Sequence, residues 1–304
     1  YCFTSGLRRH SQNYNKQRKN PAHMPGFFFY TEVLLSGIID RKAVEANQEG
    51  GSVMRSTLQK FDGRAQDYAV GRPVYAEAFV EALFRDYGFS GDAVVADIGS
   101  GTGKFAGQLL ERGCTVYGVE PNDDMREKAV EELSGFDQFY PVKGTEAGTT
   151  LKDHSVDFVT TAQAFHWFDV PAFAKECRRI LKPGGKVFLI WNVRDMNDRL
   201  NQEAYEVYRN YCPDFKGYSG GIQKDDERIR AFFDDRYQYI EFANPLYYSE
   251  ETFISRSLSG SYSLKEGDAR YQEYLKALRD LFAKYQKDGI LTMGNHTAAY
   301  FGIL

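Results

Sequence analysis

One short segment limits the folds open to this chain more than any other feature of its sequence. Residues 94–98 form an apolar run broken only by Asp97, which is the pattern of a buried strand. Three glycines then alternate through residues 99–103, and a helical pattern begins at Lys104. Glycine permits a positive φ and lets the backbone approach a ligand closely. A strand, a glycine turn and a helix in this order predict the ligand-binding edge of an α/β sheet.

The rest of the chain continues the alternation of strands and helices, which predicts a mostly parallel sheet with helices on both faces. Seven strands make the expected fold Rossmann-like, with a helical cap as an insertion. The expected strands are 93–98, 115–119, 136–142, 156–161, 186–191, 237–247 and 290–301, and the expected helices are 74–87, 104–112, 123–133, 169–181, 250–259 and 270–286. Residues 182–185 (Lys-Pro-Gly-Gly) predict a turn after the fourth of these helices.

Charge divides the chain into two regions. Residues 1–53 hold seven basic and four acidic residues, a net charge of +3, which leaves −7 for the remainder of a chain whose total is −4. We expect 1–53 to be a poorly ordered extension, with a transit peptide as the alternative, and Met54 to be the natural first residue. The folded domain would span 54–304, with the polar, tyrosine-containing stretch 194–236 as a cap that holds the substrate.

Composition excludes several classes of protein. The net charge and a pI near 5.8 argue against a nucleic-acid coat protein. The four cysteines form no Cys-x-x-Cys pair, so neither a disulfide framework nor a zinc site is expected. This use of cysteine predicts a reducing, cytoplasmic location. No apolar run approaches the ~20 residues that span a bilayer, so we expect no membrane partner. No metal is expected either, because no histidine cluster lies beside the cysteines.

The acid that follows the glycine turn narrows the ligand to one that contains a nucleoside. Glu120 ends the second strand, 17 residues after Gly103, where a carboxylate can accept hydrogen bonds from ribose hydroxyls. Dinucleotide sites carry Gly-x-Gly-x-x-Gly, whereas this chain carries Gly-x-Gly-x-Gly with Asp97 two residues before the first glycine. The spacing disfavours an NAD-dependent dehydrogenase, which is kept as an alternative function.

The segment from Asp97 to Gly103 resembles motif I of the class I S-adenosylmethionine-dependent methyltransferases. Residues 120–125, 162–168 and 181–185 are similar to further segments of the small-molecule branch called type 11. Residues 68–75 resemble the N-terminal segment of the trans-aconitate methyltransferase-like group. One departure concerns the loop after the third strand, where the branch usually reads Gly-x-Ala-Glu. Here the order is Gly-Thr-Glu-Ala-Gly from 144 to 148, so the acid comes one residue early.

The resemblance implies that S-adenosyl-L-methionine is the cofactor and that its binding residues follow the family motifs. Gln163 ends the fourth strand, at the sheet edge where such ligands bind. His166 is the candidate catalytic residue, either as a general base for a hydroxyl acceptor or as a packing histidine. The cofactor-binding candidates are Tyr68, Arg72, Asp97, Gly99, Ser100, Gly101, Thr102, Gly103, Glu120, Met125, Thr145, Glu146 and Gln163.

The function that follows is methyl transfer to a small-molecule acceptor, with a carboxylate or hydroxyl oxygen favoured as the accepting atom. Nucleic acid is not expected as a partner, because no Asn/Asp-Pro-Pro-Tyr/Phe stretch occurs and residues 54–304 carry a net charge of −7. The alternative outside enzymes is a non-catalytic module that binds the same cofactor.

Overall fold

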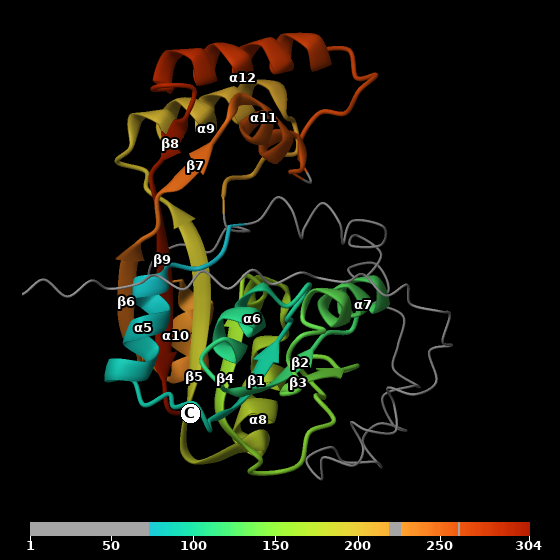
Figure 1. The fold of residues 1–304 in the computed structure, drawn as a ribbon, viewed down its shortest axis with the longest axis vertical. Coiled ribbons are helices and arrows are strands. Elements are labelled where there is room, and N and C mark those ends of the chain that lie inside the picture. The colour runs from blue at the N-terminus through green and yellow to red at the C-terminus, as the bar shows by residue number, and fades with distance from the viewer. Residues whose placement is uncertain (1–72, 219–225, 261) are drawn as a thin grey trace, which may run out of the picture.

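The computed structural model describes residues 73–218, 226–260 and 262–304. Two parts are visible in Figure 1, a sheet covered by helices and a smaller, mainly helical part beyond one end of the sheet. The predicted extension 1–53 lies outside the described residues, as do Tyr68 and Arg72.

The sheet has seven strands in the order β3-β2-β1-β4-β5-β9-β6. Strand β9 pairs antiparallel with both β5 and β6, whereas β1 to β5 pair in parallel. This confirms the predicted Rossmann-like, mostly parallel sheet of seven strands. The strands are β1 (Val94–Ile98), β2 (Thr115–Val119), β3 (Phe139–Val142), β4 (Val156–Ala162), β5 (Leu181–Arg194), β6 (Gln238–Ala243) and β9 (Asn295–Gly302).

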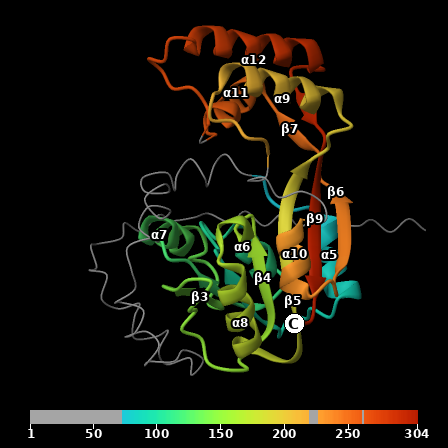
Figure 2. The same cartoon turned by 180° about the vertical axis from the view of Figure 1, so that it is seen from behind.

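Helices cover both faces of the sheet (Figures 1 and 2). One hydrophobic cluster joins α5 (Glu77–Asp86) and α6 (Lys104–Leu110) to the sheet, with Leu133 after α7 (Asp123–Glu132). The opposite cluster holds α8 (Val170–Ile180) and α10 (Glu227–Phe233). Helix α8 forms where expected, because Asp169 caps its N-terminus and its apolar side chains recur at helical spacing.

The predicted turn at 182–185 is different in the structure. Helix α8 ends at Ile180, and the chain then enters β5 directly at Leu181. The register of β5 against β4 jumps from Leu181 opposite Val156 to Lys186 opposite Phe158. The extra residues therefore form an irregularity within the strand. Gly184 lies in it with a φ of 81°, which glycine adopts readily.

The smaller part, called the cap below, has a hydrophobic core of its own. That core is centred on α9 (Arg199–Tyr211) and α12 (Tyr271–Tyr285). Of the segment 194–236, where the sequence analysis placed the cap, α9 lies in this core, whereas α10 packs Phe232 and Phe233 into the sheet cluster. The remaining elements of the cap are β7 (Leu246–Tyr248), α11 (Glu250–Leu258) and β8 (Leu291–Met293).

Among the segments that connect the sheet to the cap are those between β5 and α9 and between β8 and β9, beyond the carboxyl end of β5 (Figure 1). The side-chain amide of Asn201, fully buried, donates to the carbonyl oxygens of Asp195 (2.9 Å) and Gly294 (2.7 Å). The backbone N–H of Gly294 donates to the Asp198 carboxylate at 2.7 Å. These hydrogen bonds hold the outgoing and returning segments together, so the cap has a defined position above the sheet edge. Within the described ranges, no helix has the length and apolar character needed to cross a membrane.

Candidate active site

A cavity of about 820 Å³ lies between the carboxyl edge of the sheet and the cap. Its volume falls in the range of small-molecule and cofactor sites. Asp97 and Gly103 do not line it, and Tyr68 and Arg72 lie outside the described residues. The other predicted site residues line this one cavity: Gly99, Ser100, Gly101, Thr102, Glu120, Met125, Thr145, Glu146, Gln163 and His166.

The three glycines of the turn are required for different reasons. All three have positive φ: 70° at Gly99, 56° at Gly101 and 78° at Gly103. A Cβ at Gly99 would lie 2.6 Å from the Cβ of Ala164, and a Cβ at Gly103 would lie 2.6 Å from Cδ1 of Leu133. A Cβ at Gly101 would meet no atom within 4 Å. Gly103 thus serves helix packing, whereas Gly101 leaves open space beside the cavity.

Glu120 is fixed by the backbone of the turn. Its two carboxylate oxygens accept from the N–H groups of Gly101 and Asn122, both at 2.9 Å. Burial raises the pKa of Glu120, and these two hydrogen bonds oppose that rise. Each carboxylate oxygen can accept a further hydrogen bond, so the group can receive two hydroxyls from a ligand.

Asp97 is the most deeply buried acid near the turn. Its Oδ1 accepts from the Thr160 hydroxyl at 2.8 Å, whereas Oδ2 has no partner among the described residues. Burial raises the pKa of Asp97 to about 7. An unsatisfied buried acceptor favours a ligand that brings a donor or a positive charge to this end of the strand. Together with the open space at Gly101 and the Glu120 carboxylate, this fits a nucleoside with a cationic amino-acid tail.

Met125 and the loop after β3 line another part of the cavity on the sheet side. Asn122 caps α7 by accepting from the N–H of Met125 at 2.9 Å, which fixes Met125 at the cavity surface. Thr145 pairs with Gly148 across the loop, and Glu146 accepts from the N–H of Asp169 at 3.3 Å. An apolar side chain beside two polar ones suits a flat heterocycle with polar edges.

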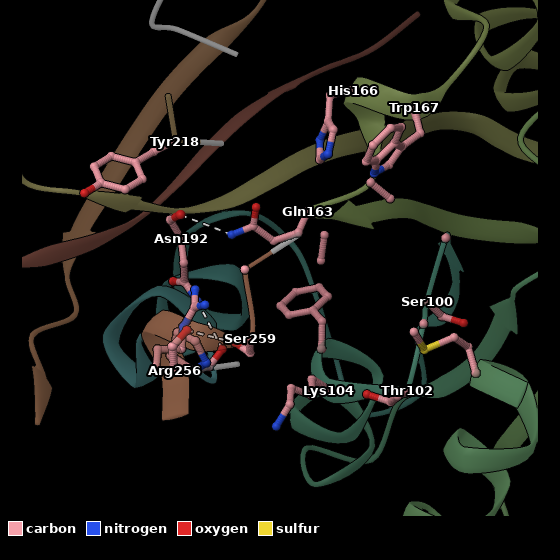
Figure 3. A pocket seen from close by; sticks show the side chains of 18 of the residues that line it. Ser100, Thr102, Lys104, Gln163, His166, Trp167, Asn192, Tyr218, Arg256 and Ser259 are labelled. Carbon is pink, nitrogen blue, oxygen red and sulfur yellow. Dashed lines mark hydrogen bonds between the residues drawn. The ribbon is translucent and has the colours of Figure 1, made fainter. Parts of the chain in front are cut away.

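Gln163 and His166 extend from neighbouring positions into the middle of the cavity (Figure 3). Gln163 has a φ of 60°, a costly conformation for a residue other than glycine, and its Nε2 donates to the carbonyl oxygen of Asn192 at 3.1 Å. His166 lies in a short 3₁₀ helix (Phe165–Trp167), with its ring centroid 4.9 Å from that of Trp167. The strained backbone of Gln163 is typical of functional positions.

The cap contributes lining residues that the sequence analysis did not identify. It expected 194–236 to form a cap that holds the substrate but named no side chain that lines the cavity there. Tyr218, Tyr248, Tyr262 and Arg256 line the cavity from the cap, and Arg194 lines it from the end of β5. A usable signal existed at the end of β5, where two polar side chains, at 192 and 194, alternate along a strand and must share a face. The described part of the chain holds no group of three His, Cys, Asp or Glu side chains arranged to bind a metal.

Comparison with known proteins identifies the family. Residues 96–189 match the model of a methyltransferase domain. An uncharacterized methyltransferase of Mycobacterium tuberculosis is 38% identical over 233 residues, which cover 76% of this chain and 88% of the relative. A methyltransferase-like protein of Schizosaccharomyces pombe is 26% identical, over 75% of this chain and 87% of its own.

Among solved structures, one from Anabaena variabilis, described as a methyltransferase from an antibiotic biosynthesis pathway, has the same fold. It superposes with a TM-score of 0.53 at 21% identity, over 75% of this chain and 97% of its own. The family model, the relatives and the glycine turn hydrogen-bonded to Glu120 all indicate the same family. The chain belongs to the class I S-adenosylmethionine-dependent methyltransferases and is an enzyme of that family.

Proposed function

We propose that this enzyme methylates an oxygen atom, carboxylate or hydroxyl, of a small-molecule acceptor. One observation carries the proposal: the cavity that contains the glycine turn and Glu120 continues without interruption past Gln163 and His166 to the cap. The cap covers the carboxyl edge of the sheet, which favours a small acceptor over a polymer. The resemblance of residues 68–75 to the trans-aconitate methyltransferase-like group supports the same class of acceptor.

The sheet side of the cavity is assigned to the cofactor. Glu120 would accept from the two ribose hydroxyls, and Met125 with Thr145 and Glu146 would contact the adenine. Gly99, Ser100, Gly101 and Thr102 would follow the cofactor with their backbone, Gly103 would hold α6 in place, and Asp97 and Gln163 would face the methionine portion. Tyr68 and Arg72 keep the role that the resemblance implies, contact with the cofactor from the N-terminal side.

S-adenosylmethionine supplies a methyl group on a positively charged sulfur, and sulfur is a good leaving group. The protein therefore has to position the accepting oxygen and exclude water. For a hydroxyl acceptor, an imidazole nitrogen of His166 would accept the hydroxyl proton. For a carboxylate acceptor no base is needed, and His166 would only orient the acceptor.

Nucleic acid remains unexpected as an acceptor, since the residues after 53 sum to a net charge of −7. A cytoplasmic location is supported by three buried cysteines, Cys114, Cys177 and Cys212, that form no disulfide.

The proposal is tested with S-adenosylmethionine that carries a radioactive methyl group, supplied with a small-molecule extract. Label in low-molecular-weight products that alkali releases as methanol would identify a methyl ester, and alkali-stable label on oxygen would identify an ether. Label on nitrogen or carbon, or on macromolecules, would contradict the proposal. Gly101→Val serves as the control, and at a cofactor concentration near the dissociation constant of the wild type it should label far less product.

A further inference from the structure

Arg194 has an environment that the cofactor does not explain. It is the last residue of β5, where the strand leaves the sheet, and it lines the cavity. Its guanidinium lies over the ring of Tyr218, 4.3 Å from the centroid, and its Nη1 lies 2.8 Å from the sulfur of Met293. No carboxylate among the described residues forms an ion pair with it.

Among the described residues, the ionisable side chains that act on this guanidinium do not balance its charge. The ionisable side chains that act on it most strongly are four tyrosines of the cap: Tyr208, Tyr218, Tyr248 and Tyr262. Burial raises the pKa of Tyr262 to about 12 and also raises the pKa of Tyr218, so both hydroxyls are neutral near pH 7. The Tyr218 hydroxyl is itself buried and has no hydrogen-bond partner in the described ranges.

The rest of this wall is also positively charged. Lys216, Arg256 and Lys265 line the cavity from the cap, against the single acid Asp214. The sheet wall has the opposite balance, with Glu120 and Glu146 against Lys104. A partly buried cation with no counter-ion among the described residues is costly, so the cap end of the cavity favours an anion.

The cationic end of the cavity lies away from Gln163 and His166. Gln163 hydrogen-bonds to the carbonyl oxygen of Asn192, and Arg194 lies two residues further along β5 toward the cap. Two residues of a strand span about 7 Å. The contacts of the guanidinium, Tyr218 and Met293, also belong to the cap side. An anion at Arg194 is therefore distant from the position that Gln163 and His166 face.

We propose that Arg194 and Tyr218 bind a carboxylate of the acceptor as an anchor and not as the accepting group. The inference rests on the proposed function, because it names the class of acceptor for the same cavity. That class is an organic acid with an unsaturated or aromatic body, which stacks among the tyrosines, and a second oxygen several ångströms from the anchoring carboxylate. The guanidinium and the Tyr218 hydroxyl donate to the anchor, and the second oxygen lies between Gln163 and His166.

Binding of a simple aryl carboxylate tests the anchor without any methyl transfer. The probe is 4-fluorobenzoate, observed by ¹⁹F NMR with the protein saturated with S-adenosylhomocysteine, and its uncharged partner is 4-fluorobenzamide. We expect the benzoate to bind and the benzamide not to bind. Arg194→Gln should weaken the benzoate at least about 30-fold, the lower end of the loss when one partner of a buried charge pair is removed. Arg209→Gln, an exposed arginine of the cap, should leave binding unchanged.

Two further variants protect the test against misfolding. Arg194→Lys keeps the charge without the planar fork and should bind the benzoate with intermediate affinity. Tyr218→Phe removes only the hydroxyl and should weaken binding severalfold. Unchanged affinity for S-adenosylhomocysteine shows that each variant is folded. Absence of benzoate binding to the wild type, or equal binding by Arg194→Gln, would overturn the anchor. Benzoate binding that depends on Arg194, with no methyl transfer to any small molecule, would leave the anion site intact and remove the proposed function, whereas transfer only to acceptors that carry no carboxylate would overturn the anchor.

Discussion

The two walls of the cavity differ in how they are built and in the charge they present. The sheet wall is a glycine turn and three strand ends, held by backbone hydrogen bonds to Glu120, and its lining acids outnumber its bases. The cap wall consists of tyrosine rings and basic side chains on a part with its own hydrophobic core. Under the proposed function, the sheet wall binds the methyl donor and the cap wall selects the acceptor. Changes in one wall should therefore alter donor affinity, and changes in the other should alter acceptor use.

The largest expected effect belongs to His166, which lies between the two walls. For a hydroxyl acceptor, His166→Ala should lower kcat by about 10²–10⁴-fold, the usual contribution of a general base. The dissociation constant of S-adenosylmethionine should stay within about twofold. Single-turnover kinetics and calorimetric titration separate the two quantities. If the variant keeps full turnover at every pH, His166 only packs, and a carboxylate acceptor is favoured.

Gly101→Val tests whether the turn holds the donor. The side chain would enter the open space beside the cavity, and the positive φ would become strained. We expect the affinity for S-adenosylmethionine to fall by about 100-fold, as for a loss of about 3 kcal/mol. Gly135→Val is the matched control, because that glycine has equally open space, an ordinary φ and a position away from the cavity. Equal affinities in the two variants would assign the turn a purely structural role.

The same contrast explains how far the sequence could be interpreted. Strand β1, the glycine turn and Glu120 lie within 27 residues and follow from local patterns, so the fold and the sheet wall were predictable. The cap wall combines residues 214–218 with 246–265, and no local pattern predicts that they meet. Helix α10 shows why: its apolar Phe232 and Phe233 require burial but do not specify which part of the protein buries them. The sequence likewise did not distinguish Gly101, beside the cavity, from Gly103, which packs against Leu133.

Asn201 tests whether the cap is a separate cooperative unit. Asn201→Ala removes two buried hydrogen bonds and leaves carbonyl oxygens of Asp195 and Gly294 without that donor. We expect a loss of about 2–3 kcal/mol in stability. Hydrogen exchange should accelerate in α9 and α12 and remain unchanged in β1. The neighbouring Gln202→Ala also removes an amide bonded to a backbone oxygen, but an exposed one, and should change little. Equal acceleration in β1 would show that the cap and sheet unfold as one.

Glu120→Ala tests the ribose assignment. Loss of hydrogen bonds to a carboxylate should weaken S-adenosylmethionine by about 1–3 kcal/mol, with the fold retained because Glu120 follows a strand end. Calorimetric titration measures the affinity, and thermal unfolding tests the fold. Glu127→Ala, an exposed acid of α7, is the control. An affinity equal to that of the control would contradict the assignment.

The smallest effect is a dependence of donor-site affinity on pH. Burial raises the pKa of Asp97 to about 7, so the empty site keeps this carboxyl largely protonated at pH 6 and ionised at pH 8. A ligand with a cationic amino group binds the ionised form better, which lowers the pKa of Asp97 in the complex and releases a proton on binding. The affinity for S-adenosylhomocysteine should therefore rise roughly tenfold from pH 6 to pH 8 and level off above the pKa of the empty site. Titrations in two buffers of different ionisation enthalpy measure the released proton. Asp97→Asn should abolish both the release and the pH dependence, and a wild-type affinity that falls over this range would show that Asp97 does not face the amino group.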